Sequence, residues 1–234
     1  MSAKLILFPV PIGSDDPDTS LPPYNRQLLN MCRFFIVEEV RTARRNLKRM
    51  GYASPIDGVT FYELNEHTAP ADIAHYLDPI AREENVGLMS EAGLPCIADP
   101  GNLITAMAQN QGIEILPLVG PSSIFMALMA SGFNGQNFAF NGYPPIADSQ
   151  RLALLRTLEQ RIYRDSQTQI FIEAPYRNDK LLSFLATHLS PQTRICVACD
   201  ITLPAQYIRT RAAREWLDNP PELHKHPAIF LLYK

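Results

Sequence analysis

The chain has 234 residues, of which 46% are hydrophobic and 19% charged, a composition that excludes wholesale disorder and a low-complexity chain. Its net charge of −3 does not resemble that of a nucleic-acid-binding arm, and its apolar runs are far shorter than the roughly 18 residues of a membrane-spanning helix. No signal peptide is expected, because the N-terminus lacks a long apolar segment with a small-residue cleavage site. Four cysteines do not make a disulfide scaffold, so a cytoplasmic location is expected.

Short apolar runs alternate with helix-like stretches through the first half of the chain. Strands are expected at residues 4–8, 34–37, 86–89 and 113–116. Helices are expected at residues 24–33, 42–50, 71–84, 103–111 and 122–131. Gly51 and Gly112 stand where two of these helices need a C-cap. Because the strands lack polar alternation, they fit burial on both faces, and the strand–helix–strand order predicts a mostly parallel sheet.

The second half keeps the apolar runs but changes their rhythm. Strands are expected at residues 138–141, 170–173, 194–201, 207–209 and 228–233, and helices at 149–164, 178–188 and 212–217. The last strands follow one another with less helix between them, which indicates a mixed sheet. We therefore predict an α/β protein of two domains, residues 1–118 with a parallel sheet and residues 119–234 with a mixed sheet.

Proline and glycine gather in loops at the ends of the expected strands. The chain has 20 prolines, well above the usual share, and clusters lie at residues 9–13, 91–101, 117–121 and 141–145. In open α/β sheets, ligands bind outside the carboxyl ends of the strands. Several rigid loops at one edge therefore predict a preorganised small-molecule site.

These loops resemble motifs of the tetrapyrrole-methylase-like superfamily of S-adenosylmethionine-dependent methyltransferases, and within it the ribosomal RNA small-subunit methyltransferase I type. The motifs are PVPIG at residues 9–13, MSEAGLPCIADPG at 89–101 and PLVGPSS at 117–123. Further matches are EEVR at 38–41, NEH at 65–67, residues 131–145, and FIEAPYR at 171–177. The resemblance runs nearly end to end, and the 13-residue block at 89–101 is a specific signal.

The resemblance implies two α/β domains with S-adenosylmethionine bound in the cleft between them, in a homodimer. The residues that it implies for cofactor contact are Pro9, Pro11, Gly13, Ser90, Glu91, Ala92, Gly93, Pro95, Ser122, Phe140, Asn141, Pro227 and Ala228. It implies ribosomal RNA of the small subunit as the acceptor, at a ribose 2'-hydroxyl. A tetrapyrrole or another small molecule is the alternative acceptor.

Methyl transfer asks the protein mainly to align donor and acceptor, since the cofactor carries the activated methyl group. A hydroxyl acceptor also profits from a base, for which Glu38, Glu66 and Glu91 are candidates. Arg41 is a candidate for holding an anionic acceptor such as a phosphate. The basic residues favour RNA if they surround the site: Arg44, Arg45, Lys48, Arg49, Arg151, Arg156, Arg161 and Arg164.

Two other functions stay open at this stage. Val40 stands where the resembled family has a threonine, and the chain is shorter at its C-terminus, which favours a protein that binds the cofactor or a related nucleoside without transferring methyl. A nicotinamide enzyme would use Glu38 or Glu39 as the acidic residue after the second strand, but the GxGxxG turn is missing.

No metal site is expected. Cys196 and Cys199 form a CxxC pattern on an expected strand, where residues three apart point to opposite faces, and no second cysteine pair exists. Buried structural cysteines are therefore favoured. His224 and His226 lie in an extended segment without an evident third ligand.

Overall fold

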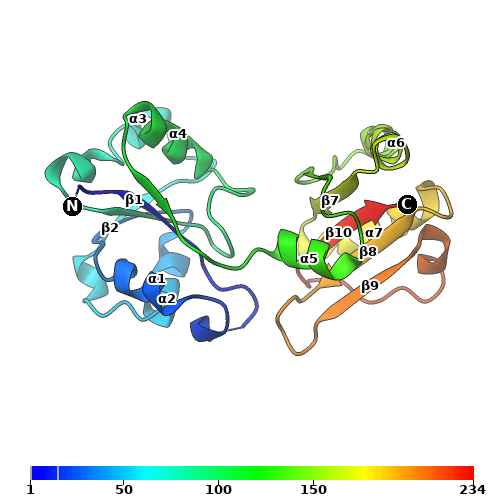
Figure 1. Cartoon of the computed structure of the whole chain (residues 1–234), viewed down its shortest axis with the longest axis horizontal. Helices are drawn as coiled ribbons and strands as arrows, with labels where there is room; N and C mark the ends of the chain where they lie inside the picture. Colours follow the sequence, from blue (N-terminus) through cyan, green and yellow to red (C-terminus); the bar gives the residue numbers. More distant parts are fainter. Residues whose placement is uncertain (1, 15) are drawn as a thin grey trace. The chain divides into compact units, whose positions relative to one another are not determined.

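Each half of the chain builds its own five-stranded sheet (Figure 1). The computed structural model describes residues 2–14 and 16–234. The chain divides into two compact units, the first ending at Ser122 and the second beginning at Ser123.

The sheet of the N-terminal unit is entirely parallel, in the order β3-β2-β4-β1-β5. Its strands are β1 (Leu5–Phe8), β2 (Phe34–Val37), β3 (Thr60–Glu63), β4 (Val86–Met89) and β5 (Ile115–Pro117). Its helices are α1 (Pro23–Leu29), α2 (Val40–Arg49), α3 (Pro70–Ile73) and α4 (Asn102–Asn110), with the 3-10 turns η1 (Pro17–Thr19), η2 (Ile56–Gly58) and η3 (Asp78–Arg82).

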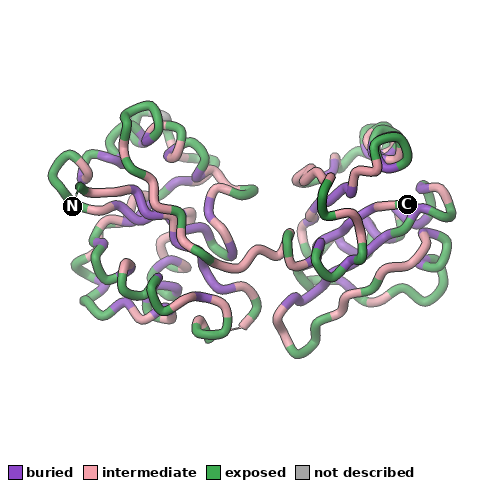
Figure 2. The backbone as a smooth tube through the Cα atoms, in the orientation of Figure 1, coloured by how far each residue is buried: buried purple, intermediate pink, exposed green. Residues whose placement is uncertain are grey.

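Successive strand residues bury on opposite faces of this sheet, as their unbroken apolar character predicts. Ile6 packs with Leu29 of α1 and Leu47 of α2, whereas its neighbour Leu5 packs with Ile104 of α4. Helices α1 and α2 therefore cover one face, and α3 and α4 the other (Figure 1). Figure 2 shows the buried strands between more exposed helices.

The sheet of the C-terminal unit is mixed, in the order β6-β7-β10-β8-β9, with β6 parallel to β7 and the other neighbours antiparallel. Its strands are β6 (Phe138–Phe140), β7 (Thr168–Ile172), β8 (Arg194–Cys199), β9 (Tyr207–Ala212) and β10 (Ala228–Tyr233). Its helices are α5 (Ser123–Ser131), α6 (Asp148–Asp165) and α7 (Asn178–His188), with the 3-10 turns η4 (Pro175–Arg177) and η5 (Ala213–Trp216).

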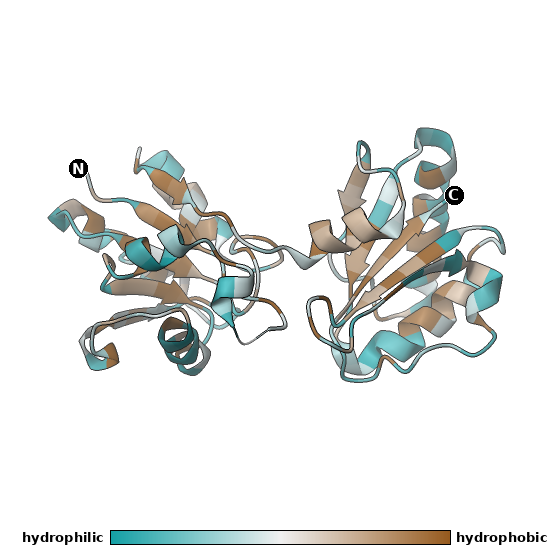
Figure 3. Cartoon of the chain, turned by 60° about the horizontal axis from the view of Figure 1, so that its bottom comes forward, coloured by the Kyte–Doolittle hydropathy of each residue, from teal (hydrophilic) through white to brown (hydrophobic). Residues whose placement is uncertain are grey.

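Helices α6 and α7 cover one face of this sheet, and α5 covers the other. The strands are hydrophobic throughout, whereas the outer helix surfaces are polar (Figure 3). Cys199 belongs to the core under α7 and Cys196 to the core under α5. This confirms the prediction that the two cysteines are buried and face opposite ways.

The two-domain α/β prediction, with one parallel and one mixed sheet, is confirmed, and three local predictions were wrong. The expected helix at 71–84 is interrupted between α3 and η3, because Pro79 lacks the amide hydrogen that a continuous helix needs. Strand β3 was missed altogether. The expected helix at 212–217 is the short 3-10 turn η5.

Candidate functional site

Strands β1 and β4 lie side by side at the centre of the N-terminal sheet, and the chain leaves them in opposite directions. From β1 it crosses to β2, and from β4 it crosses to β5 on the other side. The loops after β1 and β4 therefore diverge at the topological switch point, where open α/β sheets bind ligands. We call the sheet edge at which these parallel strands end the carboxyl edge of the N-terminal unit.

The loops after β1 and β4 are tied to each other by a reciprocal pair of backbone hydrogen bonds. The amide of Val10 donates to the carbonyl of Gly93 over 2.8 Å, and the amide of Gly93 donates to Val10 over 3.0 Å. Gly93 has a φ of 73°, which glycine adopts without strain. A Cβ added there would lie 3.5 Å from Ile12 Cγ2 and from the carbonyl oxygen of Pro121. Three loops therefore meet around Gly93.

The loop after β5 packs closely against the loop after β1. A Cβ at Gly120 would lie only 2.1 Å from Pro9 Cβ, so this close approach requires glycine. The buried side chain of Asn25 donates to the carbonyl of Val119 over 2.9 Å and holds the same loop from α1. Ser122 follows directly.

The loop at residues 90–101 is held in a strained shape by Asp99. Its carboxylate accepts from the amides of Cys96 at 2.9 Å and Gly101 at 2.7 Å. Cys96 and Ala98 have φ angles of 68° and 64°, which side-chain-bearing residues rarely adopt. Burial raises the pKa of Asp99 above its ordinary value, against the effect of these two amides. Strain of this kind persists where the surroundings fix it, and it is common at binding sites.

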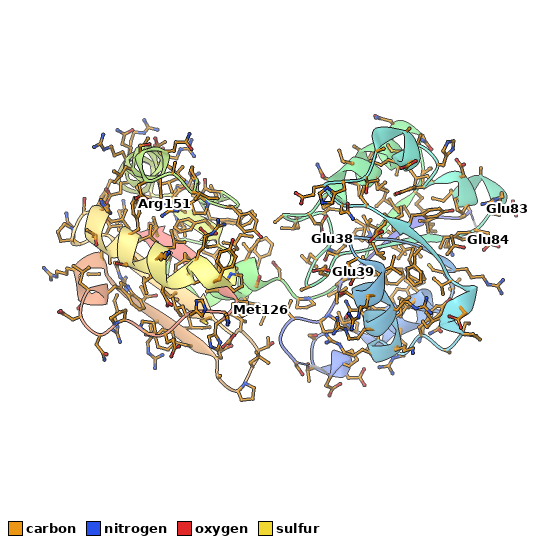
Figure 4. The ribbon with its side chains drawn as sticks, turned by 180° about the vertical axis from the view of Figure 1, so that it is seen from behind. Glu38, Glu39, Glu83, Glu84, Met126 and Arg151 are labelled. Carbon is orange, nitrogen blue, oxygen red and sulfur yellow. The ribbon has the colours of Figure 1, made fainter. Side chains whose placement is uncertain are left out.

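Glu38 and Glu39 follow β2 at the carboxyl edge (Figure 4). The amide of Glu91 donates to Glu38 Oε1 over 3.4 Å. Burial raises the pKa of Glu38, and the carboxylates of Asp99 and Glu91 raise it further. Glu38 and Asp99 line the same small cavity of about 10 Å³, which has room for about one water molecule.

Glu39 has a different task from Glu38. It caps α2 by accepting from the amides of Arg41 and Thr42, and the hydroxyl of Thr42 lowers the pKa of Glu39 most. The side chain of Arg41 is exposed at the start of α2. Glu66 is exposed in the loop after β3, with a ring nitrogen of His67 3.5 Å from its carboxylate. Glu38 therefore lies inside the site, whereas Arg41 and Glu66 lie at its rim.

The structure brings the N-terminal candidates to one edge. Those on the loops after β1, β4 and β5 are Pro9, Pro11, Gly13, Ser90, Glu91, Ala92, Gly93, Pro95 and Ser122. Pro9, Pro11, Ser90, Gly93 and Pro95 are buried, and Gly13, Glu91 and Ala92 are exposed. The hydroxyl of Ser90 donates to the carbonyl of Ala92 over 3.1 Å, which folds the loop back on itself.

The C-terminal candidates share an edge of their own unit. Phe140 and Asn141 end β6, and Pro227 and Ala228 begin β10. The amide of Asn141 donates to Ile170 of β7 over 2.8 Å. Because β6, β7 and β8 end where β10 begins, all four residues lie at the same side of that sheet.

Sequence reasoning missed the residues that hold the carboxyl edge together: Asp99, Asn25 and Asn46. Asn46 of α2 donates to the carbonyl of Glu91 over 3.4 Å. Asp99 precedes Pro100 and Gly101, a sequence typical of a turn whose carboxylate bonds nearby amides, so its role was open to prediction. The two asparagines act on loops 45 and 94 residues away, which no local pattern reveals.

Arg151 was weighed as a contact for RNA, and its surroundings contradict this. Its guanidinium donates to the carbonyls of Pro145 at 2.9 Å and Ile146 at 3.2 Å, and its side chain is 9% exposed. It also lies over the ring of Phe184. Arg151 therefore holds the loop before α6 (Figure 4).

Comparison with known proteins gives consistent results. Residues 7–215 match the family of tetrapyrrole (corrin/porphyrin) methylases. The chain is 26% identical over 219 residues to the ribosomal RNA small subunit methyltransferase I of Pseudomonas aeruginosa, covering 93% of this chain and 73% of that protein. The enzyme of the same name from Xylella fastidiosa is 30% identical over 182 residues, or 78% of this chain and 63% of that one.

Solved structures share the fold at lower identity. The methyltransferase CobJ superposes with a TM-score of 0.64 at 18% identity, covering 100% of this chain and 95% of that one. Uroporphyrin-III-C-methyltransferase from Thermus thermophilus gives a TM-score of 0.57 at 16% identity, covering 100% and 93%. Both have the two-unit α/β architecture described above.

The family match covers most of the chain and includes the carboxyl edge, which places the protein among the methyltransferases. The chain belongs to the tetrapyrrole methylase family.

Proposed function

We propose that this chain transfers a methyl group from S-adenosylmethionine to small-subunit ribosomal RNA, at a ribose 2'-hydroxyl. The observation that carries the proposal is the switch-point edge, where three Pro/Gly loops meet around Gly93. Bound there, the cofactor supplies an activated methyl group, and the protein's part is to align it with the acceptor.

The charge of the carboxyl edge suits this donor. Glu38, Glu91 and Asp99 place three carboxylates close enough to affect one another. S-adenosylmethionine carries a positive sulfonium, which such a negative edge attracts. Gly93 leaves the space of a Cβ open between the loops, so the backbone allows close approach of a ligand.

Glu38 is our candidate for the base that receives the proton of the acceptor hydroxyl. Its raised pKa brings it closer to the working range of a general base. Glu66 is farther out, in the loop after the edge strand β3, and is a candidate for contact with the acceptor. Arg41, exposed beside the Glu39 cap, is the candidate for holding a phosphate.

Two observations support RNA over a small acceptor. The curated relatives cited above act, by their names, on ribosomal RNA, and they are more similar in sequence than the tetrapyrrole enzymes among the solved structures. Helix α2 also presents Arg41, Arg45 and Lys48 at spacings of four and three residues, hence on one exposed face. Methylation of a tetrapyrrole remains the second candidate, supported by the shared fold.

The donor claim is tested by calorimetry with S-adenosylmethionine on the wild-type chain and two glycine variants. Gly93→Ala and Gly112→Ala both place alanine at a positive φ, 73° and 67°, and each costs about 1–2 kcal/mol of stability. Gly112 caps α4 with nothing near its Cβ, away from the carboxyl edge. We expect Gly93→Ala alone to lose donor binding. Equal affinity in both variants would move the donor away from this edge.

The acceptor claim is tested by labelled methyl transfer to small ribosomal subunits that lack the modification. Label in the RNA supports the proposal, and label in added tetrapyrrole instead supports the second candidate. Donor binding without label in either acceptor would indicate a protein that binds the nucleoside without transfer.

Assembly and location are further parts of the proposal. No described helix is long and apolar enough to cross a membrane, and a ribosomal acceptor would place the protein in the cytoplasm. Phe125 and Met129 of α5 are 50% and 83% exposed, and they are our candidates for a homodimer contact. Sedimentation of wild type and Met129→Glu tests it, and we expect the variant to sediment as a monomer.

A further inference from the structure

Two tracts without a role in the proposed function meet at the edge of the C-terminal sheet. Cys199 ends β8, Asp200 follows it, and His226 lies two residues before β10. Their candidate ligand atoms, a thiol sulfur, a carboxylate oxygen and an imidazole nitrogen, all lie within 4.8 Å of one another. The sequence showed no third ligand for His226, because Cys199 and Asp200 are 27 and 26 residues away.

Three elements fix these residues in place. The register of β8 and β10 pairs Cys199 with Ala228. The amide of Asp200 donates to the carbonyl of Pro227 over 3.0 Å. From the start of α7, the buried Asn178 side chain donates to the carbonyl of His226 over 2.6 Å. The cluster is therefore a preorganised one, and not a chance meeting of mobile side chains.

The cluster is buried on one side and open on the other. Cys199 and Asp200 are buried, while the His226 side chain is 48% exposed. His226 Nδ1 lies 2.7 Å from Asp200 Oδ2. A cation therefore has an entrance from solvent past the imidazole.

We propose that Cys199, Asp200 and His226 bind one Zn²⁺ ion per chain, with water as the fourth ligand. Thiolate, imidazole and carboxylate together suit zinc better than magnesium or calcium, which prefer oxygen alone. Ligand bonds of about 2.0–2.3 Å require the three atoms to lie within about 4 Å, so a small side-chain shift closes the site. The thiol proton and the proton shared by Asp200 and His226 leave to solvent as zinc binds.

Zinc at this place would also stiffen the start of β10. Pro227 and Ala228 follow His226 directly, and they are candidates for donor contact. This consequence rests on the proposed function, whereas zinc binding itself does not. The two can fail separately, since zinc is measured without any donor or acceptor.

The test is titration of the chelator-treated full chain with zinc chloride, followed by calorimetry. We expect one Zn²⁺ per chain, and at least a tenfold loss of affinity in Cys199→Ala and in His226→Gln. Each has a matched control. Cys196→Ala removes the other buried thiol of the same strand, and His224→Gln removes the neighbouring exposed imidazole. Both controls should bind zinc as the wild type does.

Cobalt substitution gives a second readout that a loss of stability does not imitate. Co²⁺ bound to the wild type should show a thiolate charge-transfer band in the near ultraviolet, which is absent in Cys199→Ala and present in Cys196→Ala. Circular dichroism checks that each variant is folded, and the exposed His226→Gln keeps the test valid if Cys199→Ala is not. No stoichiometric zinc uptake would overturn the proposal. So would equal losses in the His224 and His226 variants without an effect of Cys199→Ala.

Discussion

Glu38 is in a setting that favours its protonated form. Burial raises its pKa most, followed by the nearby carboxylate of Asp99. Because the folded chain holds this proton more tightly than the unfolded chain, the free energy of unfolding falls as pH rises from about 4.3, the ordinary glutamate value, through the raised value. At neutral pH the ionised Glu38 therefore opposes folding.

Replacing Glu38 by glutamine should stabilise the chain and weaken catalysis. At pH 7 we expect the melting temperature of Glu38→Gln to exceed that of the wild type by at most about 2 °C, a difference that vanishes below about pH 4. Methyl transfer should fall by about 10²-fold, because the variant cannot accept a proton. Melting curves and labelled transfer measured from pH 4 to 8 check both parts.

Glu84→Gln is the matched control for this change. Glu84 is exposed and precedes β4 at the opposite edge of the same sheet (Figure 4). It should change neither the pH dependence of melting nor methyl transfer. If Glu38→Gln behaved like this control, Glu38 would be neither the base nor an ionised group under strain.

At the scale of elements, α2 joins the carboxyl edge to a basic surface. Its first turn is capped by Glu39, and its exposed face carries Arg41, Arg45 and Lys48. Arg44 is already paired with Asp57. The face is therefore a candidate track for a phosphate backbone next to the donor site.

Reversing two charges on α2 should weaken RNA binding without affecting the donor. For Arg45→Glu with Lys48→Glu, we expect weaker binding to small-subunit RNA and a salt dependence lower by about 0.7 per lost phosphate contact. Affinity for S-adenosylmethionine should stay within about twofold. Filter binding across salt concentrations and calorimetry measure the two quantities.

The matched control reverses two charges at the other edge of the sheet. Arg33 precedes β2 and Arg82 ends η3, and both are exposed. Arg33→Glu with Arg82→Glu makes the same change in net charge. An equal loss of RNA binding would indicate a general effect of charge and would remove α2 from the proposed interface.

The elements also show where sequence patterns were reliable. Strands β2 and β4 and helix α7 have the predicted bounds, because each combines a continuous apolar pattern with clear end signals. Strand β3 was missed because it is an edge strand with exposed ends, which carries little apolar signal. The helix expected at 71–84 failed at Pro79, where a local rule outweighed periodicity.

For the whole molecule, the hydrophobic cores fall into two independent sets. Each core cluster draws all of its members from one unit. Trp216 is almost fully buried in the C-terminal unit, and its indole donates to the carbonyl of Ile195 over 3.2 Å. Its loss should therefore be felt first within that unit.

We expect Trp216→Ala to destabilise the C-terminal unit by about 3–5 kcal/mol. In the full chain, amide hydrogen exchange should accelerate in β7, β8 and β10 and remain unchanged in β1, β2 and β4. The reciprocal variant, Phe35→Ala, should give the opposite pattern. Uniform acceleration in both variants would mean that the chain unfolds as a single cooperative body.

The sequence by itself determined the parallel and mixed sheets, their main helices and the loops that carry the candidate donor site. Those features depend on short-range patterns: apolar runs, helix caps, and prolines and glycines at strand ends. Only the tertiary structure decided that Glu38 meets Asp99, that Arg151 is buried, and that Cys199 lies beside His226. Such pairs come from strand order and register, which join residues tens of positions apart and leave no local trace in the sequence.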